Sequence, residues 1–172
     1  ITTKGSTPYA QPDVSYNADE FVFNIKNEND IKSLFYKHKE IFPHIRQDKL
    51  LHYIETGNCI YDNEVVITFN VYKRKVRIGY RYSFFWRKVR IGNIVANKGD
   101  CILHQIVSKS GKASKILQDF FKYINTKVYL TVRESNTKAI DFYLKNDMLK
   151  IGEIAWKNNT IPGKIFLYNA TT

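Results

Sequence analysis

Hydrophobic and polar positions along the chain follow the periods of both strands and helices. Residues 20–25 alternate apolar and polar side chains, as a half-buried strand does, and residues 111–125 place apolar side chains on one helical face. Residues 59–61 and 64–72 are expected to form a hairpin around a turn at Asp62 and Asn63. The remaining expected strands are residues 101–107, 127–132, 150–156 and 164–168, and the expected helices are residues 29–41, 46–55, 111–125 and 137–145. This order predicts a mixed α/β domain.

The segment of residues 73–98 predicts a basic antiparallel β-ribbon. The fragment RKVRIG occurs at residues 74–79 and again at residues 87–92, and basic and apolar side chains alternate in both copies. No acidic residue lies between Glu64 and Asp100. A segment of one charge sign attracts polyanions, and the aromatic rings interleaved with its cations can stack on bases. A chance repeat, or a ribbon whose basic face is merely solvated, is the alternative.

Length and composition limit the number of domains and the class of protein. The chain has 172 residues, a net charge of +11 and 44% hydrophobic residues, which fits one domain with its own core. We expect residues 1–18 to form a flexible N-terminal arm and residues 19–172 to form a single domain. No apolar run reaches the roughly 20 residues of a membrane-spanning helix, and the first residues lack a secretory signal, so a cytoplasmic protein without membrane contact is expected. The two cysteines and four histidines match no ligand spacing, so no metal is expected.

A short motif in the second half of the chain carries a resemblance to a known family. Asn136, Ala139 and Tyr143 have the spacing Asn-x-x-Ala-x-x-x-Tyr, at the start of a predicted helix that follows a predicted strand. This pattern is similar to the helix after the fifth strand in the GNAT superfamily of N-acetyltransferases. The order of elements resembles that superfamily over residues 20–168, and the motifs cover residues 101–156.

A second motif lies in the predicted strand, loop and helix of residues 101–125. The pyrophosphate-binding loop of the superfamily reads Gln/Arg-x-x-Gly-x-Gly/Ala, and Gly111 and Ala113 take its two small positions. Small residues let the backbone approach a phosphate, and the N–H groups at a helix N-terminus bind it. The sequence departs from the pattern in three ways: Ser108 replaces the first Gln or Arg, the loop is shorter, and Asp147 and Met148 replace a common Gly-Phe pair.

The resemblance implies a GNAT-like α/β fold, with a mixed and mostly antiparallel central sheet flanked by helices and with the basic ribbon inserted. It also implies an acyl-coenzyme A-dependent N-acyltransferase that uses acetyl-coenzyme A or another acyl-coenzyme A. A backbone N–H near Ile106 or Val107 would hold the thioester carbonyl, and Tyr143 would protonate the departing sulfur. The residues that the resemblance assigns to donor binding are Ile106, Val107, Ser108, Lys109, Ser110, Gly111, Lys112, Ala113, Ser114, Asn136 and Ala139.

The general base and the acceptor are less defined by the sequence. His104 lies on the strand beside the expected reaction centre and is the first candidate base, with Asp100, Glu134 and an ordered water as alternatives. Residues 65–99 lack the acids that would recognise a polyamine, so a nucleic acid or nucleotide acceptor is favoured. The residues expected to bind it are Arg74, Arg77, Arg81, Trp86, Arg87 and Arg90.

Two other functions stay open at this point. One is a GNAT-derived nucleic-acid-binding module that has lost coenzyme A, which Ser108 and the short loop favour. The other is a protein or peptide N-acetyltransferase. The basic ribbon and the shortened loop also suggest the phage Mom-like branch of the superfamily, which modifies adenine in DNA, although no motif aligns with that branch. The sequence does not indicate an oligomeric state.

Overall fold

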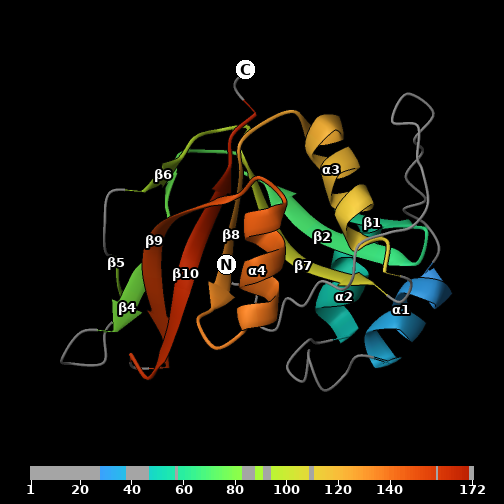
Figure 1. Ribbon diagram of the computed structural model, residues 1–172, viewed down its shortest axis with the longest axis horizontal. Coiled ribbons are helices and arrows are strands. Elements are labelled where there is room, and N and C mark those ends of the chain that lie inside the picture. The colour runs from blue at the N-terminus through green and yellow to red at the C-terminus, as the bar shows by residue number, and fades with distance from the viewer. Residues whose placement is uncertain are drawn as a thin grey trace.

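A six-stranded sheet forms the centre of the computed structural model (Figure 1). The structure describes residues 28–37, 47–56, 58–82, 88–90, 94–108, 111–157 and 159–170. The strand order is β1-β2-β7-β8-β10-β9, and neighbouring strands are antiparallel except for β7 and β8, which run parallel. The strands of this sheet are β1 (Cys59–Asp62), β2 (Val65–Val71), β7 (Cys101–Ser108), β8 (Val128–Arg133), β9 (Leu149–Trp156) and β10 (Ile161–Tyr168).

Helices α3 (Ala113–Ile124) and α4 (Thr137–Lys145) cover one face of the sheet (Figure 1). Both are amphipathic, and their apolar sides bury Phe120, Phe121 and Phe142 against side chains of the central strands, among them Leu103 and Leu130. Burying such a side chain stabilises a fold by about 1.5 to 3 kcal/mol. This cluster is therefore the main core, and it fixes the position of both helices over the parallel strands.

The opposite face of the sheet has two separate covers. Helices α1 (Glu28–Lys37) and α2 (Gln47–Glu55) pack over β1, β2 and the end of β7, where Ile31 and Leu50 belong to one buried cluster with Val107. Ile78 and Ala96 cover part of the other half, where they join a cluster with side chains of β7, β8, β9 and β10. Part of this face of the sheet lies between the two covers.

The segment between β2 and β7 folds back on itself in two short antiparallel pairs. Strand β3 (Val76–Arg77) pairs with β6 (Val95–Ala96), and β4 (Tyr80–Tyr82) pairs with β5 (Lys88–Arg90). Figure 1 shows β4 beside β9 at the edge of the molecule. The side chains of residues 80–90 lie outside the described residues, so the basic face that the sequence predicts for this segment stays a prediction.

The α/β class and the mostly antiparallel sheet flanked by helices are confirmed by the structure. The strand expected at residues 20–25 and the end of the first helix lie outside the described residues, as does the whole of the proposed N-terminal arm with its boundary at residue 18. The hairpin turn differs from the prediction by one residue. It is formed by Asn63 and Glu64, with φ angles of 50° and 62°, because Asp62 still pairs with Val65 in the ladder.

Candidate functional site

Strands β7 and β8 separate soon after they begin, and a β-bulge in β7 accounts for the separation. The two described strands pair only at Cys101 with Val128 and at Ile102 with Tyr129. On the other side of β7, the register with β2 steps from Phe69 opposite Leu103 to Thr68 opposite Gln105, which leaves His104 as the extra residue. A bulge bends its strand and increases the local twist. Because the bulge follows directly after the last pair with β8, the ends of the two parallel strands diverge.

The bulge is held by the side chain of Thr68. The Gln105 N–H donates to Thr68 Oγ1 over 3.1 Å, and the Thr68 hydroxyl in turn donates to Gln105 Oε1. Thr68 is fully buried, so this pair satisfies polar groups that the irregular ladder would otherwise leave unpaired at a high cost. The Thr68 side chain therefore stabilises the bulge of β7 at the point where the strands diverge.

Helix α3 begins beyond the end of β7 with a geometry suited to an anion. Gly111 has a φ of 72°, in the left-handed region that glycine adopts without strain. Lys112 occupies the N-cap position without a side-chain cap, and the first turn contains no acidic residue. The orphan N–H groups of a helix start attract negative charge. Lys109 and Ser110 lie outside the described residues.

The main core brings together four of the residues that the sequence motifs single out. Ile106 from β7, Ala113 from α3, and Ala139 and Tyr143 from α4 belong to one buried cluster beside the diverging strands. The side chain of Tyr143 is completely buried, and its ring lies 6.1 Å from that of Phe166. Whether these residues contact a ligand stays a prediction.

Helix α4 is started by Asn136 and tied to α3 at its end. Asn136 Oδ1 accepts from the Ala139 N–H at 3.3 Å, which is the N-cap contact expected of this residue type. Asn146, which is buried, accepts at its Oδ1 from Ser114 Oγ at 2.7 Å and from Gln118 Nε2 at 3.2 Å. The beginning of α3 is thus fixed relative to the helix that carries Tyr143.

A chain of polar side chains lies on the opposite face of the sheet, at the bulge. Asn58 Nδ2 donates to Asn70 Oδ1 at 3.2 Å, which orients the Asn70 amide so that its Nδ2 donates to His104 Nε2 at 2.8 Å. The ring of Tyr53 from α2 packs 5.3 Å from the His104 ring. These residues are far apart in sequence and form no motif, so sequence reasoning identified only His104.

Burial changes the acid–base character of His104. The side chain is 5% exposed, and burial lowers the pKa of its imidazole to about 3, because a charged ring loses its hydration in a buried site. The neutral ring accepts the Asn70 hydrogen bond at Nε2 and carries its proton on Nδ1. At neutral pH His104 is therefore an uncharged hydrogen-bonding group and a weak base.

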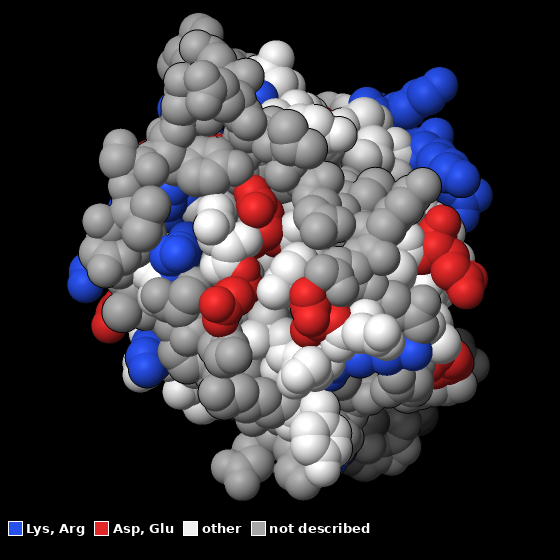
Figure 2. Space-filling model, turned by 90° about the vertical axis from the view of Figure 1, so that its right-hand side faces the viewer, with Lys and Arg blue, Asp and Glu red and all other residues white. Residues whose placement is uncertain are grey.

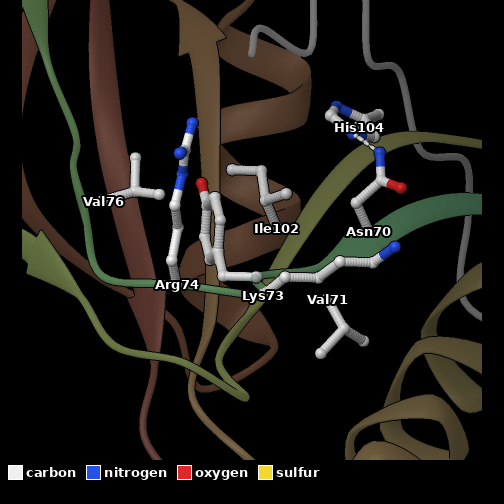
Figure 3. A pocket seen from close by; sticks show the side chains of 8 residues that line it. Asn70, Val71, Lys73, Arg74, Val76, Ile102 and His104 are labelled. Carbon is white, nitrogen blue, oxygen red and sulfur yellow. Dashed lines mark hydrogen bonds between the residues drawn. The ribbon is translucent and has the colours of Figure 1, made fainter.

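A pocket of about 560 Å³ opens on this face between the two covers. Its described lining residues are Asn70, Val71, Tyr72, Lys73, Arg74, Val76, Ile102 and His104. Figure 3 shows Ile102 in the middle, with Arg74 on the side of Val76, and Asn70 hydrogen-bonded to His104 on the other side. The cations come from the exposed turn after β2, while His104 comes from the bulge of β7.

The other candidate bases and acceptor-binding residues are dispersed. Asp100 lies just before β7, where its carboxylate accepts from the Asn97 N–H at 2.8 Å, and Glu134 lies in an exposed ion pair with Lys164 at 3.3 Å. Arg77 is exposed and is not among the residues that line the pocket. Of the remaining residues expected to bind nucleic acid, Trp86 and Arg87 lie outside the described residues, as do the side chains of Arg81 and Arg90.

Charge is unevenly distributed over the described surface. Figure 2 shows the side of the molecule that carries α1, where acidic side chains gather near the middle and Lys and Arg lie mostly toward the edges. Burial raises the pKa of Tyr61, and the neighbouring carboxylates of Asp30 and Glu64 raise it further. Among the residues that the structure describes, acidic side chains therefore gather on part of this face.

Neither a metal centre nor a membrane span is found in the part of the chain that the structure describes. No three His, Cys, Asp or Glu side chains in the described ranges are placed to hold a metal ion together. None of the four described helices is long and apolar enough to cross a membrane.

Comparison with known proteins identifies the fold. No family model and no curated protein matches the chain, but solved structures do. The ribosomal-protein-alanine N-acetyltransferase of Brucella melitensis has a TM-score of 0.56 at 8% identity, over 87% of this chain and 99% of that chain. Arabidopsis thaliana NAA60, in complex with a bisubstrate analogue, has a TM-score of 0.55 at 16% identity, over 86% and 97%. An N-acetyltransferase of Staphylococcus aureus Mu50 has a TM-score of 0.55 at 11% identity, over 84% and 95%. These structural neighbours show that this chain has the fold of the GNAT N-acetyltransferases, the fold that its two sequence motifs predicted.

Proposed function

We propose that this chain is an acyl-coenzyme A-dependent N-acyltransferase. The observation that carries the proposal is the separation of β7 and β8 at the bulge, next to a helix start that has neither a side-chain cap nor an acidic residue in its first turn. The separation exposes the backbone of one parallel strand toward the other, and the helix start offers N–H groups to a phosphate. Solved structures with the same fold are N-acetyltransferases, which supports the proposal.

The residues at the start of α3 fit the anionic end of an acyl-coenzyme A. Gly111 and Ala113 allow a close approach of the backbone, and Lys112 adds a positive charge. The backbone of Ile106 and Val107, beyond the bulge, supports the role of holding the thioester carbonyl, since a fixed N–H stabilises charge that develops on that oxygen. Asn136 and Ala139 support this site indirectly: Asn136 caps α4, and Ala139 packs the start of α4 into the core.

The bound donor supplies an acyl group on a thioester. An unprotonated amine of the acceptor attacks the carbonyl carbon, the new C–N bond forms, and the C–S bond breaks with its electron pair leaving on sulfur. The Tyr143 hydroxyl donates a proton to that sulfur, and the tyrosine regains a proton from water. The attacking nitrogen releases its extra proton to water reached through the pocket, because His104, with its pKa near 3, holds a proton too weakly to be an efficient base at neutral pH.

The class of acceptor belongs to this proposal as well. One neighbour is named a ribosomal-protein-alanine N-acetyltransferase and another a putative phosphinothricin N-acetyltransferase, which favours an amine on a protein or a small molecule. The preference for a nucleic acid stays a prediction, as does the phage-type assignment. The residues on which that preference depends are Arg74, Arg77, Arg81, Trp86, Arg87 and Arg90.

Acetyl-coenzyme A should stabilise the folded chain if this function is correct. At about 100 times its dissociation constant, a ligand that binds only the folded state raises the free energy of unfolding by about 2.7 kcal/mol. Urea unfolding with and without acetyl-coenzyme A measures this difference. Because the chain has a net charge of +11, sulfate at the same ionic strength is the control for non-specific anion binding. No stabilisation by acetyl-coenzyme A, or an equal effect of sulfate, would contradict the proposed function.

A further inference from the structure

We infer that the pocket beside His104 binds the acceptor through an anionic group, a carboxylate or a phosphate, so that the acceptor is a small amine that carries negative charge. The inference rests on the proposed function, because it assigns the pocket to the second substrate of the same reaction. It goes further in naming the chemistry that selects this substrate.

The charge of the pocket points to an anion. Lys73 and Arg74 line it from consecutive positions, and the described lining contains no carboxylate. Figure 3 shows the two cationic side chains extending to different sides of Ile102. A guanidinium offers a rigid fork of donors that matches a carboxylate or phosphate, and an ammonium adds a second charge. A protonated amine without a negative group would be repelled by these two cations.

The position of the pocket suits an acceptor. Ile102 forms the last pair of β7 with β8, and His104 is the bulged residue where the two strands part. The lining therefore extends from the exposed cations to the point at which the site for the thioester carbonyl begins. An acceptor held by its anionic group near Arg74 would direct its amine toward the bulge, and the neutral His104 ring adds no charge that would repel the amine.

The size and lining of the pocket favour a small molecule. A volume of about 560 Å³ lies within the roughly 300 to 1,000 Å³ of small-molecule sites. Val76 and Ile102 give it apolar walls, while Arg74 lies on one side and the hydrogen-bonded pair of Asn70 and His104 on the other. An amine with a modest apolar body and one anionic group satisfies all of these features.

Paired ligands and paired variants test the inference directly. The full chain, labelled with ¹⁵N, is titrated by NMR with leucine and leucinamide, and with O-phosphoethanolamine and ethanolamine. We expect the member that carries a carboxylate or phosphate to shift the signals of His104 and Arg74 in at least one pair, and the member that lacks this group to leave them unchanged. The two pairs distinguish a carboxylate from a phosphate.

Arg74→Gln and Lys73→Gln should each weaken binding at least tenfold. Arg77→Gln and Lys75→Gln remove the same charges from exposed neighbours that do not line the pocket, and should change binding less than twofold.

Two controls separate this inference from the proposed function. Acetyl-coenzyme A is titrated into the same samples. Acetyl transfer to each probe is then measured through the coenzyme A thiol that the reaction releases. If acetyl-coenzyme A does not bind but an anionic amine does, the proposed function fails and the pocket assignment stands. The inference is overturned if the amines that lack a carboxylate or phosphate bind as well as those that carry one, if neither leucine nor O-phosphoethanolamine shifts these signals at millimolar concentration, or if Arg77→Gln weakens binding as much as Arg74→Gln.

Discussion

His104 is the bulged residue of β7 and lines the pocket. Its surroundings decide whether the neutral or the protonated imidazole is stable. Asn70 donates to Nε2, and burial holds the pKa of the imidazole near 3. A residue of this type appears in the sequence as a candidate base, because its ordinary pKa is near 6.5. Sequence alone could not show that the ring is desolvated, since the groups that enclose it come from α2, β2 and β7.

The low pKa of His104 makes the chain less stable in mild acid. As the pH falls below about 6.5 the unfolded chain binds a proton at this residue, whereas the folded chain does not bind it until about pH 3. The contribution of His104 to the free energy of unfolding is therefore present above pH 6.5 and is lost as the pH falls, by about 2 to 3 kcal/mol between pH 7 and pH 4.5.

His104→Gln keeps a hydrogen-bonding group without this titration, so its unfolding free energy should fall less over that interval. His52→Gln, at an exposed position on α2, should retain the dependence of the parent chain, and equal pH dependence of all three proteins would disprove the assignment.

Tyr143 tests the chemical step rather than the fold. Tyr143→Phe removes only the hydroxyl from a fully buried ring, so packing against Phe166 is preserved. We expect turnover with acetyl-coenzyme A to fall about 100-fold, within the usual range for loss of a general acid, with little change in the affinity for acetyl-coenzyme A. Tyr123→Phe makes the same change at an exposed position on α3 and should leave turnover unchanged. If the Tyr143 variant turns over like the parent chain, proton transfer to sulfur does not depend on this residue.

At the scale of elements, local signals in the sequence predicted the helices better than the strand register. Asn136 caps the start of α4, and Ala139 is the small residue with which the first turn of α4 packs in the core. Both requirements are local, so the spacing of the two residues is visible in the sequence. The bulge at His104 depends on pairing between β2 and β7 and on Thr68, which no local pattern encodes. The hairpin turn moved by one residue because Glu64 adopts a positive φ, which sequence preferences assign to Asn or Gly.

The cap of α4 provides a test of whether Asn136 supports the fold or also binds the donor. Asn136→Ala removes the hydrogen bond to the Ala139 N–H and should lower the free energy of unfolding by about 1 kcal/mol. Asn136→Asp retains a capping oxygen and should keep the stability of the parent chain. Urea unfolding measures both variants. A weaker affinity of the stable Asp variant for acetyl-coenzyme A would assign Asn136 to the donor site, and an equally stable Ala variant would contradict its role as a cap.

At the scale of the whole molecule, the proposed donor site and the pocket lie on opposite faces of the sheet, next to the diverging strands β7 and β8. The start of α3 and Tyr143 lie on the face covered by α3 and α4, while the pocket with His104 lies on the other face, between α2 and the segment near Val76. Donor and acceptor can therefore approach the diverging strands from different directions. The residues that the sequence assigned to the donor lie in two short motifs, so local patterns could single them out. Of the residues that line the pocket, the sequence named only Arg74 and His104 as site residues, because Asn70 and Lys73 join them only in the folded chain.

The central claim is that an acyl-coenzyme A binds where α3 begins, beside the diverging strands. Calorimetric titration of acetyl-coenzyme A into the parent chain and two variants at Gly111 tests it most directly. Gly111 has a φ of 72°, and Asn and Asp are the side chains that tolerate this region best, so Gly111→Asn and Gly111→Asp differ in charge but hardly in shape. We predict that Gly111→Asp binds acetyl-coenzyme A at least tenfold more weakly than Gly111→Asn, a difference of about 1.4 kcal/mol, because its carboxylate faces the pyrophosphate. Equal affinity of the two variants and the parent chain would show that the donor does not bind at this helix.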